Sequence, residues 1–76
     1  MDKDYDFGVA IYNLKSGRKV ARRKGWNGTN MELALQVPDQ HSKMSVPYIY
    51  MLTAQGHLVP WMATQSDMLA EDWFTV

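Results

Sequence analysis

The sequence predicts a single α+β domain over residues 1–76, in which a small antiparallel sheet is accompanied by an N-terminal helix and a short C-terminal helix. Three patterns predict this fold. Apolar residues recur at helical spacing in segment 7–15, and they alternate as in strands in segments 31–37 and 48–54. Segment 64–67 resembles a helix-capping box, which predicts a helix of one or two turns. The chain shows no internal repeat and no long linker, so all elements share one core.

The first predicted element is an amphipathic helix over residues 7–15. Its apolar positions follow the spacing i, i+3, i+4 and i+7 and therefore share one face: Phe7, Ala10, Ile11 and Leu14. Asp4 or Asp6 is suited to cap the start of this helix, and Gly17 lies where a helix commonly ends.

Five short strands are expected after this helix: 19–26, 31–37, 48–54, 57–61 and, at the end of the chain, 72–76. Gln55 and Gly56 form the turn of a hairpin, and the polar segment 38–47 is expected to be a surface loop. Strand 48–54 is apolar on both faces, which predicts a central place in the sheet or at a subunit interface. Pro60 cannot donate to a sheet ladder, so its strand frays there or lies at an edge.

The composition indicates that the domain needs support beyond its core. A chain of 76 residues buries only roughly 60% of its unfolded surface, and small domains gain stability from a disulfide, a metal or a partner. The chain has no cysteine, and two histidines are too few for a closed structural zinc site unless carboxylates complete it. Its many Trp, Tyr, Phe and Met residues favour oligomerisation, since these types are enriched at interfaces. The alternative is that they fill the core of a monomer.

The charge pattern excludes several classes of partner. The formal net charge is zero, so the molecule as a whole has no field that attracts nucleic acid or an anionic membrane. The acidic first residues do not resemble a signal peptide, and no apolar run approaches the roughly 20 residues that span a bilayer. We therefore expect a cytoplasmic protein that binds neither nucleic acid nor membranes.

The sequence offers little for catalysis. His41 and His57 lie in no recognisable nucleophile motif, and the chain lacks a Gly-rich loop that would hold a phosphate. Asp67, Glu71 and Asp72 form a cluster that could hold magnesium or act as paired carboxylates, or could simply cap a helix and carry solvated charge. We expect a protein that is not an enzyme and uses no cofactor and no metal.

The one local electrostatic feature is a basic run followed by an aromatic residue: Arg18, Lys19, Arg22, Arg23 and Lys24, then Trp26. Such a run could hold a phosphate while the indole stacks on a base. It could equally be a solvated strand face that keeps a sheet edge from aggregating. Because alternate side chains of a strand point to opposite faces, Arg22 and Arg23 are not expected to face one ligand together.

The three tryptophans occupy different kinds of position. Trp73 lies in an apolar segment and is expected in the core. Trp26 and Trp61 lie at the ends of elements, where side chains reach pocket mouths and interfaces, although either could serve packing alone. Together with the basic run and the polar stretch 64–67, which includes Gln65, they have the composition of a site for a purine-bearing ligand.

Three motifs form a specific combination, although each alone is weak: Gly-Trp-Asn-Gly at 25–28, Val-Pro-Trp at 59–61 and Asp-Met-Leu-Ala-Glu-Asp-Trp at 67–73. Further characteristic segments are 6–10, 14–22, 47–49 and 63–66. With these, nearly the whole chain resembles the second Thoeris anti-defence family, a group of small phage and prophage proteins.

The resemblance implies a molecular sponge. Members of that family bind a cyclic ADP-ribose isomer made by Thoeris TIR enzymes and hold it without cleaving it, so that the effector is never activated. They form homotetramers with ligand pockets at subunit interfaces, and some also bind cyclic oligonucleotides of another defence system. The resemblance therefore implies a non-catalytic homotetramer that sequesters such a ligand.

The resemblance also assigns roles to single residues. Trp26 would stack on the ligand, and Asp67 would accept hydrogen bonds from its hydroxyls or base. Gln55 would be a polar contact where many relatives are expected to have Asn or Asp. The candidate ligand-binding residues are therefore Arg22, Trp26, Asn27, Gln55, Trp61, Gln65 and Asp67.

Two other functions stay open at this stage. One is a phosphodiesterase-like enzyme that degrades a cyclic nucleotide with Asp67, Asp72 and His57. The other is a protein-binding inhibitor that blocks a host factor through an aromatic surface. Recovery of intact ligand from denatured protein would separate the sponge from the enzyme, and titration with cyclic ADP-ribose isomers would separate it from the inhibitor.

Overall fold

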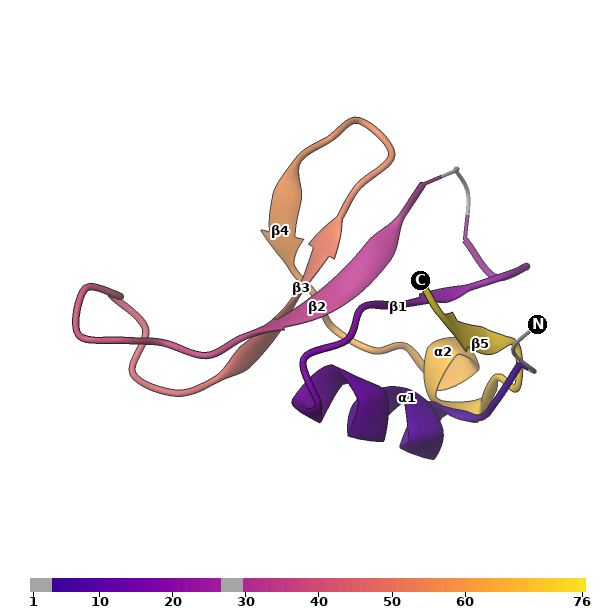
Figure 1. Cartoon of the computed structure of the whole chain (residues 1–76). Helices are drawn as coiled ribbons and strands as arrows, with labels where there is room; N and C mark the ends of the chain where they lie inside the picture. The colour runs from indigo at the N-terminus through magenta and orange to yellow at the C-terminus, as the bar shows by residue number, and fades with distance from the viewer. Residues whose placement is uncertain (1–3, 27–29) are drawn as a thin grey trace.

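Helix α1, Phe7–Lys15, opens the computed structural model, which describes residues 4–26 and 30–76 (Figure 1). It has the predicted bounds because both of its ends are fixed locally. The Asp6 side chain accepts a hydrogen bond from a backbone N–H of the first turn at 3.0 Å, so Asp6 is the N-cap. After the last turn, Gly17 adopts a φ of +89°, which glycine reaches at little cost.

Five strands form one antiparallel sheet in the order β4-β3-β2-β1-β5. Their bounds are Val20–Arg22 (β1), Glu32–Gln36 (β2), Tyr48–Leu52 (β3), Leu58–Pro60 (β4) and Trp73–Thr75 (β5). β2 and β3 pair along their whole length, whereas β1 pairs with β2 only where Val20 lies opposite Leu33. All three residues of β1 pair with β5 on the other side. The short β1 therefore depends on the C-terminal strand.

The strands are slightly shorter than predicted because turns begin earlier. β1 stops at Arg22, within the expected strand 19–26, because Lys24 turns its backbone N–H onto the side chain of Asp72. Val37, expected on the apolar face of its strand, lies beyond the end of β2 and is 65% exposed. Each of the other strands is two residues shorter than predicted.

The two edges of the sheet end differently. Next to β5, Tyr5 exchanges backbone hydrogen bonds with Trp73, and the Tyr5 hydroxyl lies 2.6 Å from that of Thr75. β4 forms the other edge and carries Pro60, as the sequence predicts, and all three of its residues are exposed. β3 lies between β4 and β2, so the predicted central place of this strand is confirmed.

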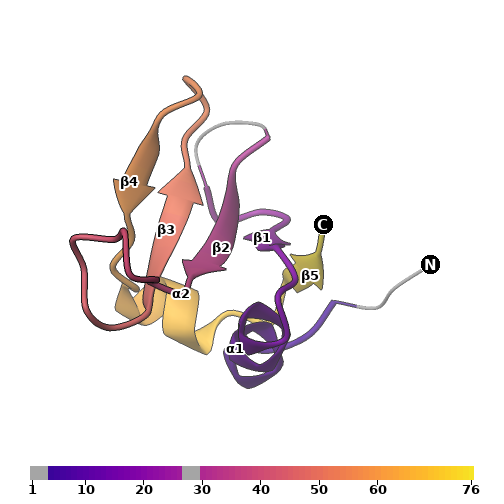
Figure 2. The ribbon, with the colours of Figure 1, turned by 60° about the vertical axis from the view of Figure 1, so that its left-hand side comes forward.

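The second helix, α2, spans Gln65–Leu69 and begins with the predicted capping box. The Thr64 hydroxyl accepts from the backbone N–H of Asp67 at 3.1 Å, and the Asp67 carboxylate accepts from the backbone N–H of Thr64 at 3.2 Å. Both helices lie on the same side of the sheet (Figure 2), where α1 contacts β1, β2, β5 and α2. Neither is long and apolar enough to cross a membrane, and the same holds throughout the described part of the chain.

The core lies between α1 and one face of the sheet. Six buried apolar side chains form it: Ala10, Leu14, Val20, Leu33, Met51 and Trp73. Trp73 is fully buried, so its predicted place in the core is confirmed. The ring centroids of Phe7, Trp26 and Trp61 lie 5.4, 5.6 and 6.0 Å from that of Trp73. These four rings join α1 to the segments that follow β1 and β4.

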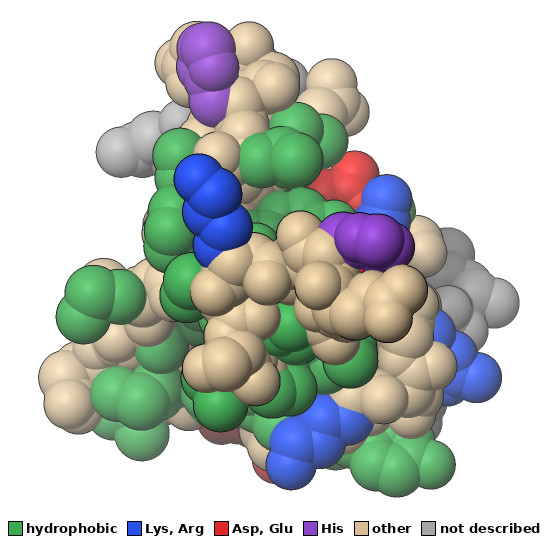
Figure 3. Space-filling view, turned by 90° about the vertical axis from the view of Figure 1, so that its left-hand side faces the viewer, with side chains coloured by type: hydrophobic (Ala, Val, Ile, Leu, Met, Phe, Trp, Pro, Cys, Tyr) green, Lys and Arg blue, Asp and Glu red, His purple; other side chains and the backbone are tan. Residues whose placement is uncertain are grey.

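The opposite face of the sheet is turned away from the core. The register places alternate residues of β2, β3 and β4 on it: Glu32, Ala34, Gln36, Tyr48, Tyr50, Leu52, Leu58 and Pro60. The loop 38–47 projects beyond the end of the sheet where β2 leads into β3 (Figure 1), and its Met44 and Val46 are both more than half exposed. Figure 3 looks from the side of this loop and shows hydrophobic side chains reaching the surface in several places. Apolar surface therefore stays uncovered in the single chain.

Candidate functional site

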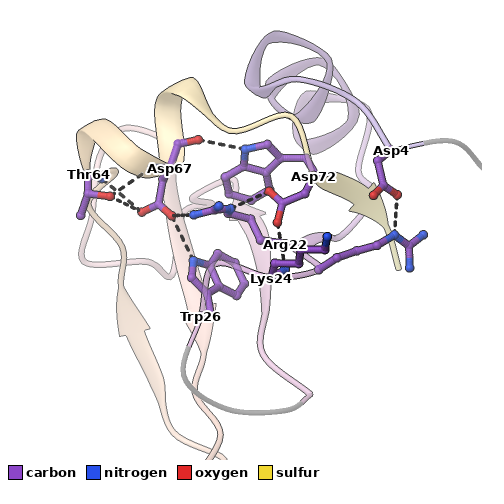
Figure 4. A network of polar contacts seen from close by, with 9 residues as sticks. Asp4, Arg22, Lys24, Trp26, Thr64, Asp67 and Asp72 are labelled. Atoms are coloured by element: carbon purple, nitrogen blue, oxygen red, sulfur yellow. Dashed lines mark hydrogen bonds and ion pairs between the residues drawn. The ribbon is translucent and has the colours of Figure 1, made fainter.

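Arg22, the last residue of β1, holds two carboxylates from the C-terminal part of the chain (Figure 4). Its Nε donates to Asp72 Oδ1 at 2.8 Å, and its Nη1 donates to Asp67 Oδ1 at 3.0 Å. The Arg22 side chain is only 12% exposed, so both ion pairs form largely out of water. Burial lowers the pKa of Arg22, but the hydrogen bonds and charges of Asp72 and Asp67 outweigh it and raise the pKa above its ordinary value.

Asp67, in α2, accepts four hydrogen bonds through its buried carboxylate. Oδ1 accepts from Arg22 and from the indole Nε1–H of Trp26, the latter at 3.1 Å. Oδ2 accepts from the backbone N–H and the hydroxyl of Thr64 at 3.2 and 2.9 Å. Burial raises the pKa of Asp67, but the hydrogen bonds from Thr64, Trp26 and Arg22 outweigh it and hold the pKa below its ordinary value. Asp67 is therefore a charged acceptor.

Asp72 joins the same network from the segment before β5. One carboxylate oxygen accepts from Arg22, and the other accepts from the backbone N–H of Lys24 at 2.8 Å. Burial raises the pKa of Asp72, but the hydrogen bond and charge of Arg22 and the hydrogen bond of Lys24 outweigh it and lower the pKa. Asp72 thus fixes the turn after β1 to the C-terminal strand.

Gly25 packs directly on the guanidinium of Arg22. A Cβ at this position would lie 2.0 Å from Arg22 Cζ, so the guanidinium would have to leave its place between Asp67 and Asp72. Only glycine lets the backbone fold so closely over a side chain, and the same turn then places Trp26 beside Asp67.

The indole of Trp26 is held at two points. Its Nε1–H donates to Asp67, and its ring meets that of Trp73 at an interplanar angle of 84° in a T-shaped contact. Trp26 is half-buried, and the remainder of its ring lines a pocket. The hydrogen bond and the T-shaped contact therefore fix the orientation of this ring.

The pocket beside Trp26 has a volume of about 610 Å³. Two aromatic rings and four polar side chains give it a mixed lining: Trp26, Phe74, Arg22, Arg23, Asn30 and Glu32. The guanidinium of Arg23 lies over the ring of Phe74 at 4.2 Å and pairs with Asp4. Small-ligand sites have volumes of roughly 300–1,000 Å³ and combine apolar walls with a few placed polar groups. A ligand with flat rings and anionic groups fits this lining.

Trp61 lines a different pocket, with a volume of about 490 Å³. Most of its wall is apolar: Ile11, Leu14, Leu35, Pro47, Tyr48 and Ile49. Lys15 adds one charged group at the end of α1. This pocket lacks the paired guanidinium groups of the first and suits an anionic ligand less well.

The structure brings together three of the seven predicted site residues, Arg22, Trp26 and Asp67. Trp61 lies in the second pocket, Gln55 lies in the exposed turn between β3 and β4, and Gln65 is exposed at the start of α2. Asn27 lies outside the described residues. The predicted residues therefore do not form one cluster in a single chain.

Arg22 is the one residue of the basic run that is largely removed from water, whereas Arg18, Lys19, Arg23 and Lys24 are exposed, as expected of a solvated face. Arg22 pairs with Asp67 and Asp72, and Arg23 pairs with Asp4. Arg22 and Arg23 both line the pocket beside Trp26, contrary to the alternation expected of a strand. The reason is that β1 ends at Arg22 and the backbone bends immediately afterwards.

Sequence reasoning missed the residues that shape the site. Gly25 and the Asp72–Arg22 pair position the turn, and Phe74 and Glu32 line the pocket. The signal for Asp72 would have been the pairing of β1 with β5, which sets Arg22 opposite the residue after Asp72. The magnesium interpretation finds no support in residues 4–26 and 30–76, where no three His, Asp or Glu side chains are grouped to hold a metal ion.

The fold and the site define a class of small α+β domains with a five-stranded antiparallel sheet, two helices on one face and a mixed aromatic and charged pocket. A family model described as "Thoeris anti-defense 2-like domain" matches residues 5–76. The chain is also 35% identical over 86 residues to "Thoeris anti-defense 2" of Bacillus phage SP01, with 96% of each chain covered. The chain belongs to the Thoeris anti-defense 2-like family. The resemblance inferred from the sequence is confirmed, and this membership supports a phage role against Thoeris defence.

Proposed function

We propose that this protein is a phage anti-defence sponge, which binds a cyclic ADP-ribose-type immune signal in the host cytoplasm and holds it without cleaving it. The observation that carries the proposal is the pocket beside Trp26, whose aromatic and guanidinium groups suit a nucleotide. Membership of the Thoeris anti-defense 2-like family supports the choice of this signal. Cyclic oligonucleotides also combine bases with phosphates, and they are the second ligand class for this pocket.

Each part of such a ligand has a counterpart in the pocket. The ring of Trp26 offers a stacking face for a base, an interaction worth about 1–3 kcal/mol. Arg23, whose side chain is 44% exposed, can donate charge-assisted hydrogen bonds to a pyrophosphate. Asn30 and Glu32 can bond to ribose hydroxyls or base edges. Arg22 pairs with two carboxylates and is largely buried, whereas Arg23 pairs only with Asp4 and is more exposed, so Arg23 is the stronger anion contact.

The pKa values of the acidic residues favour a site that binds the ligand without hydrolysing it. The pKa values of Asp67 and Asp72 lie below their ordinary range, and a general base works best when its pKa is near the working pH. His57, the third member of the hydrolase alternative, lies in the exposed turn before β4. A sponge needs only affinity and abundance, because it lowers the free signal below the dissociation constant of the effector by mass action.

We also propose that the working form is a homotetramer in which a neighbouring subunit completes the pocket. Glu32 lines both this pocket and a smaller hollow of about 230 Å³ formed with Tyr50, Leu52 and Leu58 on the outer face of the sheet. A second copy that covers this apolar face would also close the pocket. Light scattering should give a mass about four times the 8.8 kDa of the chain, whereas a monomer would contradict the proposal.

The sponge is tested by what the protein releases. Purified protein is incubated with cyclic ADP-ribose isomers, washed and denatured by heat, and the released compounds are identified by mass spectrometry. We expect one isomer to be retained and released intact in an amount stoichiometric with the sites. Cleaved products would indicate the phosphodiesterase-like alternative. Retention of no isomer would favour a protein-binding inhibitor.

A further inference from the structure

Donors of the chain itself occupy the hydrogen-bond acceptor positions of the Asp67 carboxylate. An ionised carboxylate offers about four lone-pair directions, and the donors to Asp67 are also four: two from Thr64, one from Arg22 and one from Trp26. The side chain is only 8% exposed. A ligand hydroxyl could bond to Asp67 only by displacing one of these donors.

Two of the residues that donate to Asp67 also line the pocket, Arg22 and Trp26, and Trp26 is the one that offers a ring. Trp26 reaches the pocket from the turn that follows β1, where Asp72 holds the backbone of Lys24 and Gly25 rests on Arg22. The bond to Asp67 then fixes the rotation of the ring, which the T-shaped contact with the core alone would leave less restricted. A ring held in one orientation loses less conformational freedom when a base stacks on it.

The carboxylate of Asp67 is itself held rigidly. The capping box ties it to the first turn of α2, and Arg22 ties it through Asp72 to the segment before β5. Its backbone carbonyl accepts from the Nε1–H of Trp73, the central core residue, at 3.0 Å. Asp67 thus fixes the position of Trp26 relative to the core.

We propose that Asp67 is a positioning residue, which orients the ring of Trp26 for stacking and makes no direct contact with the ligand. Arg22 acts with it by fixing the same carboxylate oxygen. This inference rests on the proposed binding of a nucleotide signal beside Trp26, and it reassigns Asp67 from the ligand contact that the family resemblance implies.

A double-mutant cycle separates the two roles. Trp26→Phe keeps an aromatic face but removes the Nε1–H donor. Asp67→Asn removes the charge and replaces one acceptor oxygen by an NH₂ donor at nearly constant shape. We expect Asp67→Asn to weaken the binding of the retained cyclic ADP-ribose isomer by about tenfold in the wild type, and by less than about twofold when Trp26 is already Phe. Equal losses in both backgrounds would overturn the proposal. Glu71→Gln, the same charge change on an exposed side chain beside Asp72, should leave the affinity unchanged.

A second measurement needs no ligand. In ¹H–¹⁵N spectra of the free protein, the indole signal of Trp26, assigned by its loss in Trp26→Phe, should exchange with solvent about tenfold faster in Asp67→Asn. An unchanged indole signal would overturn the proposal. If the wild type binds no isomer, the nucleotide site fails as a function, while this spectrum still decides whether Asp67 positions Trp26.

A third variant tests the proposal even where Asp67→Asn does not fold. Asp67→Glu keeps the charge and has the residue type usual at this position of a capping box, but it moves the carboxylate by one methylene. We expect Asp67→Glu to fold, to shift the indole signal of Trp26 and to weaken binding. A folded Asp67→Glu protein with an unchanged indole signal and unchanged affinity would contradict the positioning role.

Discussion

At the residue scale, the ion pairs of Arg22 attach the C-terminal part of the chain to β1. Arg22 is the only described cation that pairs with both Asp67 and Asp72, which come from α2 and from the segment before β5. Removing one partner of a buried ion pair costs about 3–5 kcal/mol, because the other charge stays buried without compensation. For a domain of this size, such a loss is a large part of the total stability.

The stability of the fold should depend on pH through Asp67 and Asp72. Their pKa values are lower in the folded chain than in the unfolded chain, so their stabilisation is complete above the ordinary carboxyl pKa. It is lost as the pH falls through the lower, folded values. Urea unfolding at a series of pH values from ~7 to ~2 should show this loss. The acid slope should become shallower in Asp67→Asn, and an unchanged slope would contradict the role of Asp67.

The contact of Gly25 with Arg22 gives a second residue-scale prediction. Gly25→Ala places a methyl group where the guanidinium lies, so Arg22 must leave at least one of its carboxylates. We expect the free energy of unfolding to fall by about 3 kcal/mol, measured by urea denaturation. Gly8→Ala is the matched control, since the nearest atom to its Cβ is the Asp6 carboxylate at 3.3 Å. A change as small as that of the control would show that Gly25 does not need to be small.

These residue contacts were largely beyond prediction from the sequence. The polar stretch containing Asp67 and the importance of Trp26 could be inferred, because capping boxes and aromatic turns have local signatures. The partners of Arg22 could not, since Asp72 lies 50 positions away and no local pattern encodes that contact. The Gly25 contact depends on the position of that same guanidinium.

At the scale of elements, the sequence correctly predicted the bounds of an element wherever residues adjacent to it in the sequence end it. α1 has its predicted bounds because Asp6 and Gly17 define them, and the hairpin of β3 and β4 follows the turn at Gly56. The place of β5 beside β1 could not be predicted, because it depends on pairing between distant parts of the chain. The predicted strands are too long because the turns next to them begin earlier than the sequence pattern indicates.

The N-terminus of α2 gives the element-scale prediction. Thr64→Ala removes the hydroxyl that accepts from the backbone of Asp67 and donates to its carboxylate. We expect the free energy of unfolding to fall by about 1 kcal/mol in thermal or urea denaturation, the usual cost of losing an N-cap. Ser66→Ala, an exposed change in the same helix, should have almost no effect. Equal effects of the two substitutions would contradict the capping role of Thr64.

At the scale of the whole molecule, one network serves both stability and the pocket. The ion pairs that attach α2 and β5 also hold the turn that carries Trp26, so folding and the shape of the site are coupled. The outer face of the sheet carries the exposed Leu58, and this is the face that we propose a neighbouring subunit covers. In this account the single chain supplies an oriented ring and guanidinium groups, and assembly encloses them.

The most direct test of the sponge is a calorimetric titration of the protein with cyclic ADP-ribose isomers. The account predicts saturable binding of one isomer to the wild type. It predicts no binding to Trp26→Ala, whose mass by light scattering should equal that of the wild type. Absence of heat with every isomer, or unchanged affinity in Trp26→Ala, would contradict a signal-holding pocket beside Trp26.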